Sequence, residues 1–185
     1  MTGARDPSCD PPVIRLVSGM AAEEALGPIM QVMQAAFDPV YGEAWNHSQA
    51  RSMLAMPLTH TIIAEIPAIA ERSFGRTSEQ SGDHAGPGQP IGFSMSRRTG
   101  DEEELLLIAV TPQWRHFGAG SSLLTQVIDN AQDAGVERIF LEMRSNNPAS
   151  HLYHKFGFRQ VGIRKNYYKG VDSQLYDALT LALTL

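Results

Sequence analysis

The fold of this chain is decided by residues 105–135, LLLIAVTPQWRHFGAGSSLLTQVIDNAQDAG. The unbroken apolar run 105–110 is too short for a helix and is typical of a buried strand. After the loop RHFGAG (115–120), apolar residues recur at helical spacing as far as Gly135, a residue that tolerates the left-handed end of a helix. The segment therefore predicts a strand, a glycine-containing loop and a helix.

The loop RHFGAG has the features of a phosphate-binding site. The first N–H groups of a helix lack partners within the helix and lie at the positive end of its dipole. Gly118 and Gly120 remove the side chains that would keep an anion away, and Arg115 adds a forked donor. The same glycines also suit a tight strand-to-helix turn without a ligand, and the loop alone leaves both interpretations open.

Two common phosphate-binding motifs do not fit this loop. A dinucleotide-binding motif needs a third glycine where Leu123 stands, and a P-loop needs a Gly-Lys-Ser/Thr triplet that the chain lacks. A third possibility does fit. VTPQWRHFGAGSSLL (110–124) resembles motif A of the GNAT superfamily of acetyl-CoA-dependent N-acetyltransferases, whose core is Gln/Arg-x-x-Gly-x-Gly/Ala; Arg115, Gly118 and Gly120 fill its three positions.

A second stretch carries the same resemblance. NNPASHLYHKFGF (146–158) is similar to the family segment Asn-x-x-Ala-x-x-Leu-Tyr-x-x-x-Gly-Phe, with matches at Asn146, Ala149, Leu152, Tyr153, Gly157 and Phe158. The two segments occur in the order and at the separation that the family has. The resemblance covers residues 105–168 closely, whereas the N-terminal third matches only in the order of its elements.

The resemblance implies a single α/β (α+β) domain with helices on both faces of a mixed, mostly antiparallel sheet of six to seven strands, whose parallel central strands splay apart. The patterns along the chain agree, with strands predicted at 13–17, 60–66, 91–97, 105–110, 138–144, 158–161 and 176–183, and helices at 21–37, 48–56, about 120–135 and 148–156. We expect a disordered leader at 1–12, one domain at 13–185, and a flexible Gly/Ser/Pro-rich insertion at about 72–90. Pro28 is expected either to start the first helix or to kink it.

Composition excludes several classes of protein. With 43% hydrophobic and 19% charged residues and a net charge of −5, the 185-residue chain has no basic excess for nucleic acid or an anionic membrane. No apolar run approaches the roughly 20 residues of a membrane span. Cys9 is the single cysteine, so no disulfide can form within the chain, which agrees with a cytoplasmic location. The sequence does not indicate an oligomeric state.

The resemblance implies acetyl-CoA as the cosubstrate. Its pantetheine arm would lie along the backbone of Ile108, Ala109 and Val110, with the N–H of Val110, at a strand bulge, facing the acetyl oxygen. The diphosphate would lie on the loop and helix start, at Arg115, His116, Phe117, Gly118, Ala119, Gly120 and Ser121. His116 departs from the arginine common in the family, and a neutral imidazole attracts phosphate less. Asn146 would contact the cofactor or cap the turn locally.

The resemblance also assigns the catalytic groups. Tyr153 would be the general acid towards the thiolate, since a phenol with a pKa of about 10 keeps its proton at neutral pH. Glu142, in the segment LEMR, would be the base, by similarity to Leu-Glu-Val-Arg of the RimI-type subgroup, which acetylates the N-terminal alanine of a ribosomal protein. One residue is missing between Glu142 and Asn146 relative to that subgroup. Glu103 and Glu104 are alternative bases, although most of this acidic run is also explained as a solvated strand end.

The sequence therefore predicts an N-acetyltransferase that acts directly on a primary amine, with a protein or peptide N-terminus as the preferred acceptor. NYYKG (166–170) resembles a subgroup segment near the acceptor entrance, so Tyr167 and Tyr168 either line that entrance or are ordinary strand residues. A small-molecule amine acceptor and a non-catalytic acyl-CoA-binding module remain alternatives. His151 and His154 have a metal-like spacing but no third ligand nearby, so no metal is expected.

Overall fold

The computed structural model describes residues 13–67, 88–171 and 173–185. It contains a seven-stranded sheet in the order β1-β2-β3-β4-β5-β7-β6, in which β4 and β5 are parallel and all other neighbours are antiparallel. The strands are β1 (Arg15–Ser18), β2 (Thr59–Ile66), β3 (Gln89–Thr99), β4 (Glu102–Val110), β5 (Arg138–Arg144), β6 (Arg159–Lys169) and β7 (Leu175–Thr184). This confirms the predicted mixed, mostly antiparallel sheet.

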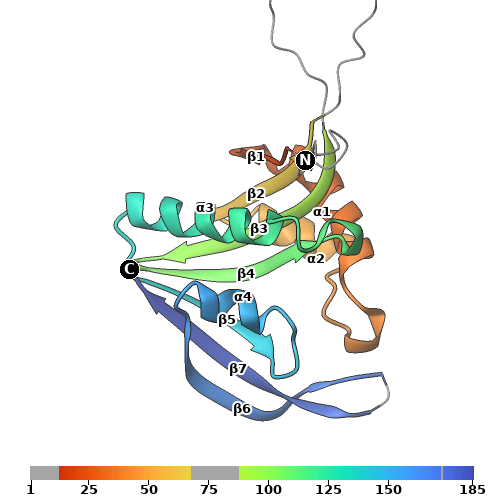
Figure 1. The fold of residues 1–185 in the computed structure, drawn as a ribbon, viewed down its shortest axis with the longest axis vertical. Helices are drawn as coiled ribbons and strands as arrows, with labels where there is room; N and C mark the ends of the chain where they lie inside the picture. The colour runs from red at the N-terminus through yellow and green to blue at the C-terminus, as the bar shows by residue number, and fades with distance from the viewer. Residues whose placement is uncertain (1–12, 68–87, 172) are drawn as a thin grey trace, which may run out of the picture.

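Helices cover the sheet on both faces (Figure 1): α1 (Ala22–Ala36), α2 (His47–Leu54), α3 (Ala119–Asp133) and α4 (Ser150–Lys155). Two cores result. One contains buried side chains of α3 and α4 against one face of the sheet, and the other contains α1 against the opposite face of β2, β3 and β4. In α3, the apolar residues that predicted the helix form its buried side, namely Leu123, Leu124, Val127 and Ala131.

Several boundaries differ from the sequence-based prediction. Pro28 lies inside α1, which begins at Ala22, so it does not start the helix. Helix α2 begins at His47 because Asn46 and Gln49 form a capping box. The predicted leader and most of the predicted insertion at 72–90 lie outside the described residues, but β3 begins at Gln89, so the insertion ends earlier than expected. No helix in the described part of the chain is long and apolar enough to cross a membrane.

The parallel strands β4 and β5 pair over a short stretch. Glu102, Glu103 and Glu104 of β4 pair with residues 138–140 of β5, and the pairing ends there. Beyond this point the strands separate, which confirms the splayed central strands. As a result, Leu106, Leu107 and Ile108 remain partly exposed although they are apolar residues of a central strand.

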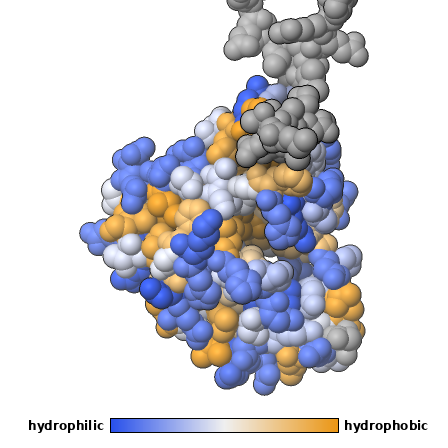
Figure 2. Space-filling model, in the orientation of Figure 1, coloured by the Kyte–Doolittle hydropathy of each residue, from blue (hydrophilic) through white to orange (hydrophobic). Residues whose placement is uncertain are grey.

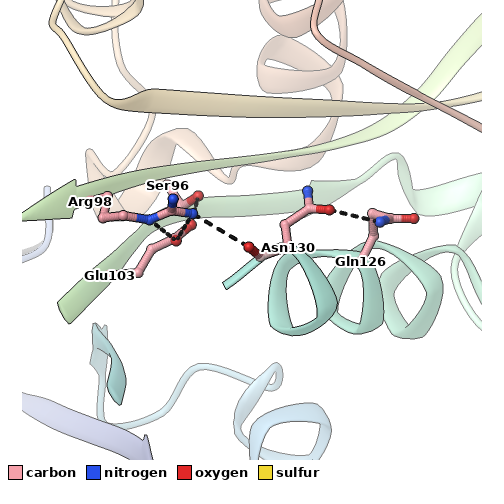
Figure 3. A network of polar contacts seen from close by, with 5 residues as sticks. All are labelled: Ser96, Arg98, Glu103, Gln126 and Asn130. Carbon is pink, nitrogen blue, oxygen red and sulfur yellow. Dashed lines mark hydrogen bonds and ion pairs between the residues drawn. The ribbon is translucent and has the colours of Figure 1, made fainter. Parts of the chain in front are cut away.

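The paired end of β4 and β5 contains a buried polar network (Figure 3). Glu103 is only 1% exposed and accepts hydrogen bonds from Ser96 Oγ and from Arg98 Nε and Nη2, the latter two at 3.3 and 3.0 Å. Arg98 also donates to the backbone carbonyl of Asn130 on α3 at 3.5 Å, and the Asn130 side chain accepts from Gln126. The prediction of a solvated strand end was therefore wrong for Glu103, which joins the β3–β4 hairpin to α3.

Candidate active site

A cavity of about 390 Å³ lies where β4 and β5 separate. In Figure 2 the surface is hollowed at this place, between the half of the molecule with β1 to β4 and the half with β5, β6 and β7. Its walls are formed by β4, β5, the α1–α2 loop, α4 and β6. The lining residues are Phe37, Gly42, Glu43, Ala44, Trp45, Gln49, Leu105, Leu106, Leu107, Ile108, Leu141, Glu142, Met143, Asn147, Tyr153 and Tyr168. We refer to it as the β4–β5 cavity.

The edge of β4 that faces this cavity has backbone donors that no described strand uses. The N–H of Thr111 donates to Ile91 of β3 at 2.8 Å, and the β3–β4 register is regular between Val110 and Leu107. Because alternate N–H groups of a strand point to the same side, the N–H groups of Ile108 and Val110 point away from β3, towards the gap. This free edge can accept a linear ligand with hydrogen-bonding groups, as an added strand would do.

The bulge that was predicted at Val110 lies elsewhere. The register shift falls between Leu105 and Leu107, which leaves Leu106 as the extra residue, whereas Val110 pairs regularly with Gly92. The expectation that Val110 stands at a bulge was therefore wrong. The bulge coincides with the start of the cavity, and a bulge at that point bends β4 away from β5.

The loop before α3 has the geometry that anion binding requires. Gly118 is the residue before the helix and has φ +95°, and His116 has φ +69°. Within the described residues, no side chain caps this helix end, and apart from its chain neighbours no atom would lie within 4 Å of a Cβ at Gly118. The first helical hydrogen bond is donated by Ser122, so the N–H groups of Ala119, Gly120 and Ser121 have no helical partner and can bind an anion.

Arg115 donates to two backbone carbonyls of its own chain, and its contact with a diphosphate stays a prediction. Its Nε donates to the Val110 carbonyl at 3.1 Å, and its Nη2 donates to the Ala36 carbonyl at 2.9 Å. The guanidinium thus joins the end of β4 to the last turn of α1. Phe117, beside it in the sequence, is about half exposed and packs edge-on against Trp114.

Tyr153 lies in the wall of the cavity. Its side chain is 6% exposed and its ring packs edge-on against Phe158, with the ring centroids 5.8 Å apart. Burial, and then the negative charge of Glu43, raise the pKa of the Tyr153 hydroxyl well above its ordinary value. The phenol therefore keeps its proton throughout the neutral range.

Glu142 also reaches the cavity, from β5. Its carboxylate pairs with Arg164 of β6, whose guanidinium lies 3.9 Å from the ring centroid of Tyr167. Glu103 and Glu104, the alternative bases, are not in the cavity wall: Glu103 is in the buried network, and Glu104 pairs with Arg97 at 3.6 Å. The structure therefore brings Glu142, and neither of these two, together with Tyr153.

The asparagine that lines the cavity is Asn147, one position after the predicted one. Asn147 Oδ1 accepts from the Ala149 N–H at 2.9 Å, before α4 begins at Ser150. The Asn146 side chain instead accepts a hydrogen bond from Arg144. Contact of Asn146 with a cofactor stays a prediction.

The two adjacent tyrosines of β6 differ in position. Tyr168 lines the cavity, and burial followed by the charge of Glu43 raises its pKa. Tyr167 is about half exposed and stacks on Arg164. Only Tyr168 therefore contributes to the cavity wall. Within the described residues, no three or more His, Cys, Asp or Glu side chains form a group suited to a metal ion.

Sequence reasoning missed Glu43. It lies in the loop between α1 and α2, it lines the cavity, and its Oε1 accepts from Arg144 Nε at 3.1 Å. No motif covers this loop, which contains the large aromatic residues Tyr41 and Trp45. The available signal was a carboxylate placed between those two aromatic residues in a loop that precedes a short helix.

Comparison with known proteins agrees with this arrangement. The sequence model of the Acetyltransferase (GNAT) family matches residues 32–158, more than half of the chain. The chain belongs to the GNAT acetyltransferase family. Among similar GNAT proteins, the [ribosomal protein bS18]-alanine N-acetyltransferase of Haemophilus influenzae is 38% identical over 97 residues, and that of Escherichia coli is 36% identical over 99 residues. These alignments cover 52% and 53% of this chain and 66% of each relative.

Solved GNAT structures share the whole fold. The crystal structure of the ribosomal-protein-S18-alanine N-acetyltransferase from Escherichia coli matches with a TM-score of 0.72 and 25% identity, covering 93% of this chain and 94% of that one. A chain of the NatC complex bound to Gag peptide and CoA matches with a TM-score of 0.69 and 23% identity, covering 93% and 98%.

Proposed function

We propose that this GNAT protein transfers the acetyl group of acetyl-CoA directly to the N-terminal amine of a protein. The observation that supports this most strongly is the β4–β5 cavity, in which Tyr153, Glu142 and the unpaired edge of β4 face one another. The names of the similar bacterial enzymes support the choice of a protein N-terminus over a small amine.

The chain offers a continuous site for the cosubstrate. The diphosphate binds the N–H groups at the start of α3, within the segment Arg115 to Ser121. The pantetheine arm follows β4 along Ile108, Ala109 and Val110, where it bonds the N–H groups that no strand uses. This arrangement places the thioester at the separation of β4 and β5, beside Tyr153.

The chemistry needs one base and one acid. The amine nitrogen attacks the thioester carbonyl carbon, the C–N bond forms and the C–S bond breaks. Glu142 takes the proton that the amine loses, and Tyr153 donates its hydroxyl proton to the departing thiolate. The products are an acetylated amine and the free thiol of coenzyme A, with no covalent intermediate on the enzyme.

The test is an assay of thiol release with acetyl-CoA and a set of acceptors. A peptide with a free N-terminal alanine should release thiol and gain one acetyl group by mass spectrometry, and the same peptide with a blocked N-terminus should do neither. Lysine, a polyamine and an aminoglycoside represent small amines, and faster turnover with any of them would contradict the proposed acceptor. Heat of acetyl-CoA association in calorimetry without turnover on any amine would identify a binding module instead.

A further inference from the structure

Glu43 is a second carboxylate of the β4–β5 cavity, contributed by the loop between α1 and α2. It is half-buried, and it faces the same space as Glu142, Tyr153 and Tyr168. The cavity therefore has two carboxylates, one from the loop and one from β5. The proposed acetyl transfer uses only the Glu142 carboxylate, so the Glu43 carboxylate is available for another role.

The position of Glu43 is fixed by Arg144, at the end of β5. The Arg144 side chain is 5% exposed, and its Cζ lies 3.4 Å from the ring centroid of Tyr41 and 5.4 Å from that of Tyr176. It also donates to Asn146. Tyr41 and Glu43 thus attach the loop to the end of β5, which holds the Glu43 carboxylate in place without a ligand.

One oxygen of the Glu43 carboxylate is available to bind a ligand. Arg144 contacts Oε1, and no donor among the described residues contacts Oε2. A carboxylate accepts up to about four hydrogen bonds, so it can bind a cation in addition to Arg144. The pKa values of Tyr153 and Tyr168 both respond to the charge of Glu43, which places this charge within electrostatic reach of both rings. Glu142, by contrast, is paired with a half-exposed arginine, Arg164.

We propose that Glu43 binds the ammonium group of the acceptor and so sets the affinity of the cavity for a charged amine. The bound ammonium loses one proton to solvent to give the neutral amine that attacks, and Glu142 accepts the proton that the nitrogen loses on attack. This inference rests on the proposed acetyl transfer to an amine. An N-terminal ammonium has an ordinary pKa of about 8, so it is mostly charged at pH 7 and suits a fixed carboxylate. Glu43 is then an acceptor-binding residue that determines specificity.

The experiment measures binding without chemistry. Wild-type protein saturated with coenzyme A is titrated by calorimetry with a peptide bearing an N-terminal alanine and with its desamino analogue, in which hydrogen replaces the amine. Glu43→Gln keeps an acceptor oxygen for Arg144 but removes the charge. It should weaken binding of the amine peptide about tenfold and leave the desamino peptide unchanged. Glu23→Gln is the matched control, because Glu23 pairs with Arg51 on the surface, outside the cavity.

Kinetics provide the second measurement. Glu43→Gln should raise KM for the amine peptide about tenfold with kcat within about threefold of wild type. Equal weakening of both peptides, or a lost kcat with an unchanged KM, would overturn the proposal. A cooperative thermal unfolding transition above the assay temperature shows that the variant is folded, although its midpoint should fall because Arg144 loses its counter-charge. Absence of turnover in the wild-type protein would contradict the proposed acetyl transfer instead, and the difference between the two peptides would still test the role of Glu43.

Discussion

The two ends of the β4–β5 pair are built in opposite ways. At the paired end, Glu103 is buried in a network with Ser96 and Arg98, and its carboxylate is bonded on both oxygens. At the separated end, Glu43 and Glu142 each pair with one arginine and face a cavity.

The comparison shows that partners, rather than residue type, decide what a glutamate does here. A buried carboxylate whose two oxygens are both bonded within its own chain stabilises the fold and is out of reach of a ligand. A carboxylate that lines the cavity at the separated end keeps an oxygen that a ligand can reach, and the free edge of β4 lies at the same end. The buried polar network and the residues proposed for chemistry thus lie at opposite ends of one pair of strands.

The largest expected effect is a loss of stability from a substitution at the paired end of β4 and β5. Glu103→Gln leaves Arg98, which is 20% exposed, without its counter-charge, and we expect a loss of about 3 kcal/mol in the free energy of unfolding. Urea denaturation measures this. Glu104→Gln, which removes a one-third exposed pair with Arg97, should cost less than about 1 kcal/mol. Equal losses in the two variants would show that the network is no more stabilising than a surface ion pair.

The next effect tests the separated end. Tyr153→Phe should lower kcat at least about tenfold, because the thiolate loses its proton donor, while the Kd for acetyl-CoA stays the same. Steady-state rates and calorimetry measure the two quantities. Tyr167→Phe is the matched control, since Tyr167 lies outside the cavity wall and should keep wild-type turnover. Unchanged turnover in Tyr153→Phe would remove this residue from the mechanism.

A third change separates ligand binding from stability at the start of α3. A Cβ on Gly120 would meet Leu152 Cδ2 at 3.5 Å and Val110 Cγ2 at 3.8 Å, which are ordinary contacts. Gly120→Glu should therefore fold, and its charge suits a helix start, but it should weaken acetyl-CoA binding about tenfold by repelling the diphosphate. Gly120→Ala should bind nearly as wild type does. Full affinity in Gly120→Glu would place the diphosphate elsewhere.

The smallest effect appears at alkaline pH. The folded pKa of Tyr153 is raised above its ordinary value of 10.0, so its contribution to stability is complete below pH 10 and is lost as pH rises above that value. Between pH 10 and 11 the wild type should lose about 1 kcal/mol more than Tyr153→Phe in urea denaturation. Parallel losses in the two proteins would show that Tyr153 ionises as readily when folded as when unfolded.

The sequence was most informative where a single local pattern determines structure. The strand, the loop RHFGAG and the helix α3 follow directly from apolar spacing and glycine placement. The start of α2 was predicted one residue late, although the Asn46–Gln49 capping box was present in the sequence. Strand β6 was predicted to begin at 158–161, and it spans Arg159–Lys169; its end was not predicted, because its exposed edge position tolerates charged residues that conceal the strand pattern.

The parts that were missed depend on contacts between distant segments. Whether Glu103 is solvated depends on Arg98 and on α3, and neither is visible in an acidic run. Glu43 becomes part of the site only because Arg144, 101 residues away, anchors its loop. That Asn147 rather than Asn146 lines the cavity depends on the contact between Arg144 and Asn146 and on the turn before α4.

The free edge of β4 has a further consequence. An unpaired strand edge invites association with other chains, and this one lies in the middle of the sheet, where the cavity walls shield it. Bound coenzyme A should therefore also stabilise the folded protein. The amide protons of Ile108 and Val110 should exchange more slowly with solvent, and the purified protein should resist precipitation for longer.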